Sequence, residues 1–360
     1  MTTNVSQSLE LLAAYRRKID VALQQCFDEA LALLSVDLSN HSQQALKYMR
    51  EYSLRPAKRI RGALGAVTYD TATHEEFSSV GLQLAVVLEL MQSYLLIVDD
   101  VMDKSGTRRG RPTLHKLYEA DAKGFGELHE AEMLAVNAGL LTQHLANIVL
   151  ARIAVPPQVL QQAFLVLHKN IAATGFGQLD DMYQRAGRPL EEADVIRKYR
   201  LKSSYYTFIN PLQLGFTLAA KATPELMQAC QDFGEAAGIA FQLHDDYLGV
   251  FGDPALLGKP TLDDIREGKV TLLSHYALTH AKTADQTTLL GILGNETADV
   301  ADLKRVRQIF TDCGATAYNQ DRALSYAKSA KKQLAAKPFK DSAFQDLLAA
   351  LVDYSIERQQ

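Results

Sequence analysis

Cysteine is scarce in this sequence, and the few cysteines present form no pattern. Cys26, Cys230 and Cys313 are far apart and odd in number. No CxxC pair and no Cys/His spacing suggests a zinc site. We therefore expect three buried, reduced thiols, and neither a disulfide framework nor a zinc centre.

An excess of positive charge is also lacking. The formal net charge is −4, from 38 Lys and Arg against 42 Asp and Glu. Nucleic-acid binding calls for a strongly basic face, so no nucleic acid partner is expected. Any polyanionic ligand must therefore be bound by local clusters of cations.

Long uninterrupted apolar runs are missing as well. The most apolar stretch, residues 82–98, contains Glu89 and two glutamines and runs into Asp99, which makes it a poor membrane span. The first seven residues lack a basic segment followed by an apolar core, so no signal peptide is evident. We expect a soluble cytoplasmic protein with no membrane span.

Alternating runs typical of strands do not stand out, whereas apolar residues recur at helical spacing along most of the chain. Gly and Pro fall mostly between these segments, as helix punctuation should. No Pro/Gly/Ser-rich linker and no repeat divides the sequence. The fold class predicted is all-α, as a single helical domain over residues 1–360. The expected helices span residues 6–34, 75–103, 127–153, 157–185, 190–201, 204–221, 224–251, 263–282, 299–313, 315–336 and 341–357.

Two acidic clusters end long apolar segments. Asp99 and Asp103 are four residues apart, so their carboxylates share one helix face, whereas Asp100 points roughly 100° away. Asp245 and Asp246 form the second cluster. Like charges on one face repel unless a cation lies between them, and Mg²⁺ typically takes one or two carboxylates plus substrate phosphate oxygens. Facing each other, the clusters would form a multi-metal site for a diphosphate.

A single acidic cluster could simply be a solvated helix end. Two such clusters, with Asp245 lying 146 residues after Asp99, are harder to explain in that way.

Basic residues lie where a phosphate-binding site would need them. Lys58 and Arg61 are three apart on one face, and Arg108 and Arg109 follow the first acidic cluster. Arginine binds phosphate bidentately, whereas lysine acts as a mobile point charge. Each of these residues alone would be interpreted as a solvated surface charge, and no G-x-x-x-x-G-K-[ST] loop is present. Further downstream are Lys202, Lys259 and Lys269.

At these residues the sequence resembles the trans-isoprenyl diphosphate synthase (polyprenyl synthetase) family, with a pattern most like farnesyl and geranylgeranyl diphosphate synthases. Residues 99–103 match its first aspartate-rich motif, without an insertion between the aspartates. Residues 177–181 (GQLDD) match its GQxxD motif, and residues 202–203 (KS) resemble its KT motif. Residues 241–246 match the second aspartate-rich motif, and residues 258–269 match the lysines that follow it. Several positions depart from the pattern: Pro56 and Ala57 replace a glycine pair, Ser203 replaces a threonine, and Gly249 replaces the last aspartate of the second motif.

The resemblance implies an isoprenoid synthase type fold, a helical bundle around a central cavity, and a Mg²⁺-dependent prenyltransferase. The enzyme would condense isopentenyl diphosphate head-to-tail with dimethylallyl or geranyl diphosphate and release pyrophosphate. Family members usually form homodimers, and we expect one here.

The resemblance also implies roles for individual residues. Three Mg²⁺ ions per active site are expected, held by Asp99, Asp103 and Asp245. Gln178, Ser203 and Gln242 would line the carbocation region. The allylic diphosphate would be bound by Arg108, Lys202 and Lys259, with Lys269 nearby, and isopentenyl diphosphate by Lys58, Arg61, Gln92 and Arg109.

Product length should depend on the residues just before Asp99, because in this family the growing chain runs between helices from the first aspartate-rich motif. Tyr94 and Leu95 lie five and four residues before Asp99 and would form the floor of that space. We predict a fifteen-carbon product, farnesyl diphosphate, with the twenty-carbon geranylgeranyl diphosphate as the next choice. The alternative is that Tyr94 only packs in the core.

Three other functions compete with this prediction. A class I terpene cyclase shares the first acidic motif and the helical fold, but it has no need of the basic residues Lys58, Arg61 and Arg109. A non-catalytic subunit of a heteromeric prenyl synthase commonly lacks one aspartate cluster, whereas both are present here. A structural or metal-buffering helical protein would bind Mg²⁺ without a diphosphate.

Overall fold

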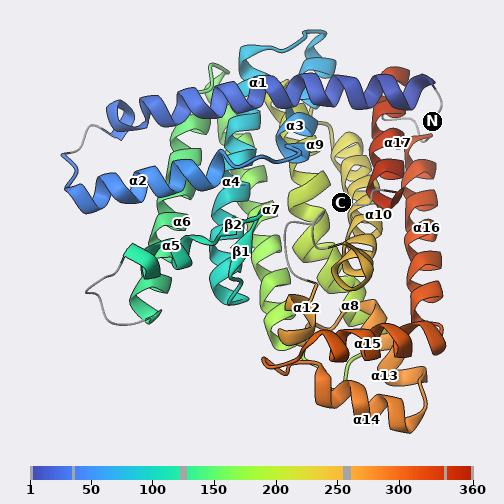
Figure 1. Cartoon of the computed structure of the whole chain (residues 1–360). Helices are drawn as coiled ribbons and strands as arrows, with labels where there is room; N and C mark the ends of the chain where they lie inside the picture. Colours follow the sequence, from blue (N-terminus) through green and yellow to red (C-terminus); the bar gives the residue numbers. More distant parts are fainter. Residues whose placement is uncertain (1–2, 35–36, 122–127, 254–260, 336–338, 358–360) are drawn as a thin grey trace. The chain divides into compact units, whose positions relative to one another are not determined.

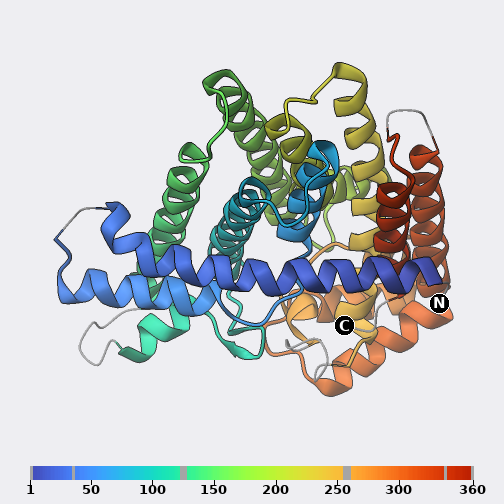
Figure 2. The ribbon, with the colours of Figure 1, turned by 90° about the horizontal axis from the view of Figure 1, so that it is seen from above.

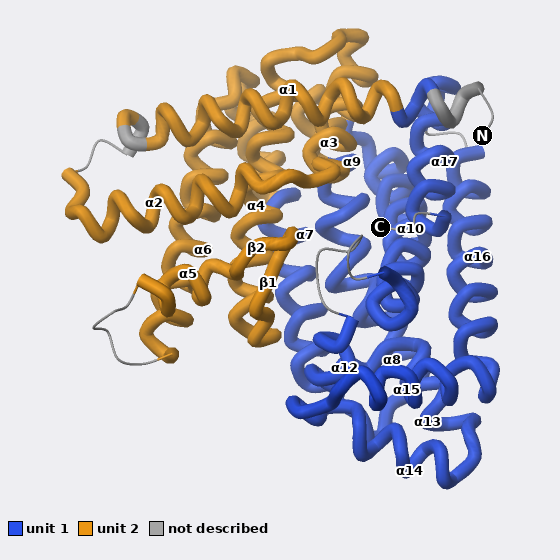
Figure 3. Tube along the Cα trace, in the orientation of Figure 1, with its two compact units in different colours: residues 1–9, 166–213, 222–360 blue, residues 10–165, 214–221 orange. Residues whose placement is uncertain are grey.

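The computed structural model describes residues 3–34, 37–121, 128–253, 261–335 and 339–357. Within these ranges the chain is helical apart from short connections and one hairpin of two-residue strands, so the predicted all-α class is confirmed (Figure 1). The residues fall into two compact units, coloured separately in Figure 3. Unit 1 comprises residues 1–9, 166–213 and 222–360, and unit 2 comprises residues 10–165 and 214–221. The single domain over residues 1–360 stays a prediction.

Unit 2 is built around one apolar helix, α4, which packs against α3 and α6. The helix starts at Ser78, whose side chain accepts the N–H of Gly81, a standard N-cap contact. Gly65 of α3 permits close approach, because a Cβ there would lie 2.4 Å from Leu88 Cδ1. The elements are α1 (Thr3–Leu34), α2 (Asn40–Ser53), α3 (Ile60–Thr73), α4 (Ser79–Met102), β1 (Thr107–Arg108), β2 (Arg111–Pro112), α5 (Leu114–Asp121) and α6 (Leu128–Ala151).

Unit 1 is built around α10, which packs against the π-helix η1 and against α16 and α17. Thr223 caps its N-terminus, with Pro224 in the first turn, where proline is well tolerated. The elements are α7 (Pro157–Tyr183), α8 (Glu192–Tyr199), η1 (Arg200–Ile209), α9 (Asn210–Leu218), α10 (Pro224–Phe251), α12 (Asp263–Arg266), α13 (Leu272–His280), α14 (Thr283–Ile292), α15 (Val300–Asp312), α16 (Ala315–Leu334) and α17 (Ser342–Glu357). Residues of α7 and α9 contribute to both units.

Most of the predicted long helices are present, and four helices were not predicted. These are α2, α3, α5 and α14. The sequence of α3 includes two glycines and three threonines, which favour helix weakly. Nine of its residues are nevertheless buried in a row, from Gly62 to Asp70, so packing rather than local preference forms this helix.

Two predicted boundaries were wrong. The break expected between residues 201 and 204 does not exist, because α8 continues through η1 into α9. The single helix expected over residues 263–282 is two helices, α12 and α13. Gly268 lies between them with a φ of +65°, and a Cβ at this position would lie 2.9 Å from Gly294 Cα. Only glycine therefore fits there.

Two helices, α4 and α6, are long and apolar enough to cross a membrane on length and composition alone. The apolar window of α4 is 67% buried within the fold, and that of α6 is 39% buried. A core helix of a globular protein passes the same test, so this is weak evidence for a membrane span. The expected absence of a membrane span stays a prediction.

Candidate active site

The first acidic cluster lies at the C-terminal end of α4, in unit 2. Asp99 and Asp103 are partly exposed, and Asp100 between them is fully buried. Asp103 is the C-cap residue, and its N–H donates to the carbonyl of Asp99 at 2.8 Å. The helix geometry therefore separates the carboxylates as the spacing predicted, with two facing one way and Asp100 facing the core.

Asp100 anchors the end of α4 and orients Arg108. Arg108 Nε donates to Asp100 Oδ1 at 2.7 Å, and the Tyr52 hydroxyl donates to Oδ2 at 2.5 Å. Burial raises the pKa of the Asp100 carboxyl above its usual range, although Arg108 and Tyr52 oppose this shift. Arg108 Nη2 also lies 3.5 Å from Asp99 Oδ2. A guanidinium is thus fixed beside the first aspartate of the cluster, and its role in binding the allylic diphosphate stays a prediction.

The basic run 55–61 is divided between buried and partly exposed side chains. Arg55 and Arg59 are buried, and Arg59 Nη1 donates to Glu89 Oε2 at 3.1 Å. Lys58 and Arg61, the two residues expected to bind isopentenyl diphosphate, are the partly exposed ones. Buried arginines thus hold the segment in place and leave the other two cations at the surface.

Gln92 and Arg109 are the other two residues expected to bind isopentenyl diphosphate. Gln92 is buried on α4, and its Oε1 has no hydrogen-bond partner among the described residues. Buried polar atoms are normally paired, so this oxygen fits a ligand-binding position. Arg109 has a φ of 54°, which is uncommon for a residue other than glycine. Burial and the nearby Arg59 lower the pKa of Arg109 to about 10.

Tyr94 and Leu95 lie on α4 one helical turn before the acidic cluster, and both are partly buried. Burial raises the pKa of the Tyr94 phenol. The ring is therefore partly shielded from water without being sealed in the core. This placement is compatible with the predicted floor and leaves that role a prediction.

In unit 1, the KS motif lies in η1, between two close helix contacts. A Cβ on Gly177 would lie 2.3 Å from the backbone N of Lys202, and a Cβ on Gly238 would lie 2.4 Å from Ser204 Cα. The glycines on α7 and α10 thus let both helices touch the backbone of η1. π-Helical segments are rare and often occur at functional sites, and this one presents Lys202 and Ser203.

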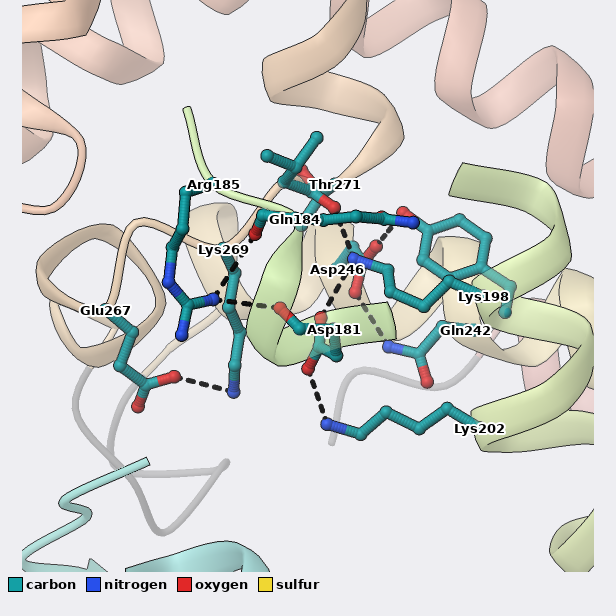
Figure 4. Close-up of polar contacts among 12 residues, drawn as sticks. Asp181, Gln184, Arg185, Lys198, Lys202, Gln242, Asp246, Glu267, Lys269 and Thr271 are labelled. Carbon is teal, nitrogen blue, oxygen red and sulfur yellow. Dashed lines mark hydrogen bonds and ion pairs between the residues drawn. The ribbon is translucent and has the colours of Figure 1, made fainter. Parts of the chain in front are cut away.

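Asp181 of the GQLDD motif pairs with two lysines, as Figure 4 shows. Lys202 Nζ lies 2.6 Å from Oδ2, and Lys198 Nζ lies 2.9 Å from Oδ1. Burial alone would raise the pKa of the Asp181 carboxyl, but the charges of Lys202, Lys198 and Lys269 outweigh it and hold that pKa well below its usual range. Asp181 is therefore a carboxylate in a small, cation-rich network.

A second chain of hydrogen bonds links the KS motif to the second aspartate-rich motif. Ser203 Oγ donates to Gln242 Oε1, and Gln242 Nε2 donates to Asp246 Oδ1 at 2.7 Å. The Tyr199 hydroxyl donates to Asp246 Oδ2 and accepts the N–H of Leu272 at 2.7 Å. The hydroxyl that Ser203 retains in place of threonine thus makes the contact that fixes Gln242.

Asp245 is partly exposed on α10, next to the buried Asp246. Gly249, one turn later, faces Asp264 of α12, because a Cβ at Gly249 would lie 2.1 Å from Asp264 Oδ2. The carboxylate of Asp264 therefore occupies the space where a side chain at position 249 would begin. This packing explains why the last position of the motif accommodates glycine.

The remaining predicted residues are distributed as follows. Gln178 is partly buried on α7, beside the motif glycine. Lys269 pairs with Glu267 at 2.6 Å, and its backbone forms an isolated bridge with Arg185. Lys259 lies outside the described residues. Within unit 1, the structure thus places Lys202 in the Asp181 network and joins Ser203 to Gln242 in the second chain of hydrogen bonds.

Sequence reasoning missed three residues that hold these side chains in place. Tyr52 supports Asp100, Tyr199 supports Asp246, and Lys198 supports Asp181. Lys198 and Tyr199 lie four and three residues before Lys202, the spacing of neighbours on a helix face. That spacing was the available signal, but a lysine and a tyrosine on a helix are usually partly exposed.

The carboxylates suit Mg²⁺ only together with other ligands. Among the described residues, no group of three or more His, Cys, Asp and Glu side chains could hold a metal ion by itself. Mg²⁺ is commonly bound by one or two carboxylates, with waters and substrate phosphates completing its octahedron. Partly exposed, hard oxygen donors such as Asp99, Asp103 and Asp245 fit that type of site.

Comparison with known proteins gives consistent matches over nearly the whole chain. A geranylfarnesyl diphosphate synthase of Aeropyrum pernix is 33% identical, over 84% of this chain and 90% of that protein. A short chain isoprenyl diphosphate synthase of Methanothermobacter thermautotrophicus is 29% identical, over 84% of this chain and 86% of its own.

A solved structure supports the same relationship. The geranylgeranyl pyrophosphate synthase of Corynebacterium glutamicum, crystallised with isoprenyl diphosphate and magnesium, has a TM-score of 0.87 and 30% identity, covering 96% of this chain and 98% of its own. The profile of the polyprenyl synthetase family matches residues 43–310. These residues include both acidic clusters and the basic residues described with them, and the chain therefore belongs to the polyprenyl synthetase family.

Proposed function

We propose that this protein is a Mg²⁺-dependent prenyltransferase that joins isopentenyl diphosphate to an allylic diphosphate. One observation carries the proposal: each aspartate-rich motif has oriented basic residues in its own unit. Arg108 is fixed beside Asp99 and Asp100 in unit 2, and Lys202 and Lys198 share a network with Asp181 near Asp246 in unit 1. A protein that binds metal without a diphosphate has no use for these cations.

The residue roles follow the resemblance and are part of the proposal. Asp99, Asp103 and Asp245 hold Mg²⁺, three ions per active site, and when bound the metal neutralises charge that develops on the leaving diphosphate. Arg108, Lys202, Lys259 and Lys269 bind the allylic diphosphate. Lys58, Arg61, Gln92 and Arg109 bind isopentenyl diphosphate, and Gln92 would do so through its Nε2–H, which can donate to a phosphate oxygen.

The chemistry is a substitution at the first carbon of the allylic substrate. The carbon–oxygen bond to diphosphate breaks, and Arg108 and Lys202 bind the departing oxygens. The double bond of isopentenyl diphosphate forms the new carbon–carbon bond, and a proton is then lost to the departing diphosphate. The Ser203–Gln242 pair, held by Asp246, presents fixed dipoles to the transient positive charge.

Purified protein should be incubated with labelled isopentenyl diphosphate, Mg²⁺ and each allylic starter in turn. We expect pyrophosphate release and a longer prenyl product, both lost when Mg²⁺ is removed with a chelator and restored on its return. Release of pyrophosphate from an allylic diphosphate alone would instead indicate a terpene cyclase. No turnover with any starter, despite Mg²⁺ binding, would contradict the proposal and favour a non-catalytic role.

Fifteen carbons is the product length that we propose, because Tyr94 and Leu95 combine an aromatic ring with a branched side chain one turn before Asp99. Replacing Tyr94 with Ala should lengthen the product by one five-carbon unit or more, since it removes the ring. Chromatography of the dephosphorylated products measures this. An unchanged product would contradict the assignment of Tyr94 to the floor.

Geranylgeranyl diphosphate is the second candidate product. It is favoured by the relatives, since similar proteins include geranylgeranyl and geranylfarnesyl diphosphate synthases. The wild-type product in the same chromatogram separates the two candidates. A twenty-carbon wild-type product would place the floor deeper along α4 than Tyr94.

We also propose that the protein forms a homodimer. The outward side of α6 carries a row of exposed apolar residues, Met133, Leu134, Leu140 and Leu141, each more than 40% exposed. Exposed apolar patches of this kind mark interaction sites. A second copy of the chain is the simplest occupant and is the one that the family resemblance implies.

A further inference from the structure

Lys198 is a buried cation to which the proposed function assigns no role. It is only 3% exposed, and its Nζ lies 2.9 Å from Asp181 Oδ1 and donates to the carbonyl of Val270 at 2.5 Å. Lysine is almost never buried without a partner. Here the partners come from the GQLDD motif and from the residue after Lys269, so Lys198 connects two motifs of unit 1 (Figure 4).

The Asp181 carboxylate is shared by two lysines in different environments. Lys198 is almost fully buried, with 4% of its side chain exposed, whereas Lys202 is 24% exposed. Each lysine contacts a different oxygen of Asp181. One ion pair is therefore sealed within the fold, and the other is accessible to a ligand.

A diphosphate that binds Lys202 must compete with Asp181 for the ammonium group. Without Lys198, the buried carboxylate of Asp181 would lose its ion pair at Oδ2 when Lys202 turned to the ligand and would depend on the charge of Lys269. An uncompensated buried charge is strongly unfavourable. With Lys198 in place, Oδ1 stays paired throughout, and the release of Lys202 costs much less.

We propose that Lys198 is a positioning residue for the allylic diphosphate, acting as the permanent counter-ion of Asp181 so that Lys202 can transfer to the substrate. This inference rests on the proposed function, in which Lys202 binds that diphosphate. It assigns Lys198 no contact with the substrate. Its effect is on substrate affinity, through the position and availability of the Lys202 ammonium group.

The test uses Lys198→Met, which keeps most of the length of the side chain and removes its charge. We expect KM for the allylic diphosphate to rise about tenfold, with KM for isopentenyl diphosphate changed less than about twofold. Titration calorimetry with inorganic pyrophosphate and Mg²⁺ should show a comparable loss of affinity. Arg197→Met is the matched control, since this neighbour on α8 is 48% exposed and pairs at the surface with Asp194 and, at 3.7 Å, with Asp180, without contacting Asp181.

The double variant Lys198→Met/Asp181→Asn distinguishes positioning from packing. It removes both buried charges, so Lys202 is no longer held and pyrophosphate affinity should return to within about threefold of wild type. A folded single variant with unchanged affinity would overturn the inference, and so would a double variant as weak as the single one. If the variants show this binding pattern but the wild-type protein shows no prenyl transfer, the proposed function is overturned and the inference stands.

Discussion

At the scale of single residues, burial distinguishes charged side chains that build the fold from those available to a ligand. Within 55–61, Arg55 and Arg59 are buried, whereas Lys58 and Arg61 are partly exposed. The acidic pair 99–100 divides in the same way, with Asp100 held by Tyr52 and Arg108. Some charged residues of the motifs therefore stabilise the fold, and others are available to a ligand. Residues of the two kinds can be adjacent in the sequence.

The cysteines illustrate what burial does to chemical reactivity. All three are free, as predicted, but only Cys26 and Cys230 are buried, and Cys313 is partly exposed. Burial raises the pKa of Cys26 to about 11 and that of Cys230 further. Because the thiolate is the reactive form, these two thiols are inert near neutral pH.

We expect one fast-reacting cysteine, Cys313, when the folded protein is treated with a chromogenic disulfide reagent at pH 8, and three after unfolding in guanidinium. The stability of the fold should also fall at high pH because of Cys26. A folded pKa above the unfolded value means that the Cys26 contribution to stability is complete below about pH 9 and is lost as pH rises toward 11. Equal labelling rates for all three thiols in the folded state would contradict the expectation that Cys313 alone reacts fast.

At the scale of elements, glycine decides how closely helices approach η1. Gly177 and Gly238 contact its backbone from α7 and α10, and a Cβ at either position would lie under 2.5 Å from a backbone atom of η1. Backbone atoms cannot swing aside as a side chain can. Two close helix contacts thus help to position the π-helical segment that carries Lys202 and Ser203.

Gly177→Ala should destabilise the fold by about 1–3 kcal/mol, because the added methyl group overpacks the contact with Lys202. Urea unfolding followed by circular dichroism measures this change. The matched control is Gly175→Ala on the same helix, where a Cβ would meet nothing within 4 Å. That variant should be neutral or more stable by about 0.5–1 kcal/mol, since alanine favours helix. Equal effects of the two substitutions would contradict the assigned contact.

At the scale of the whole molecule, the apolar outer side of α6 calls for an explanation. The opposite side of α6 packs on α4, where a Cβ on Gly139 would lie 3.1 Å from Val98 Cγ2. Leu140 and Leu141 are exposed and take no part in this contact. The helix as a whole is long and apolar enough to cross a membrane on length and composition alone. A homodimer would bury these residues without a membrane.

Leu140→Glu/Leu141→Glu should convert a dimer into a monomer, because two carboxylates in an apolar interface lose hydration without gaining a partner. Light scattering coupled to size-exclusion chromatography gives the mass of each species. Leu290→Glu is the control, since Leu290 is 49% exposed on α14 in unit 1. A monomeric wild type, or a double variant that remains dimeric, would refute the proposed interface.

The sequence by itself determined the helical class, the order of the motifs and the different directions of Asp99 and Asp100, because these follow from local periodicity along the chain. Only the tertiary structure decided that Lys198 and Tyr199 are buried supports, that Asp264 fills the space beside Gly249, and that α3 is a helix at all. Each of these depends on contacts between residues distant in the sequence. Local pattern carries no information about which distant side chain removes a given group from water.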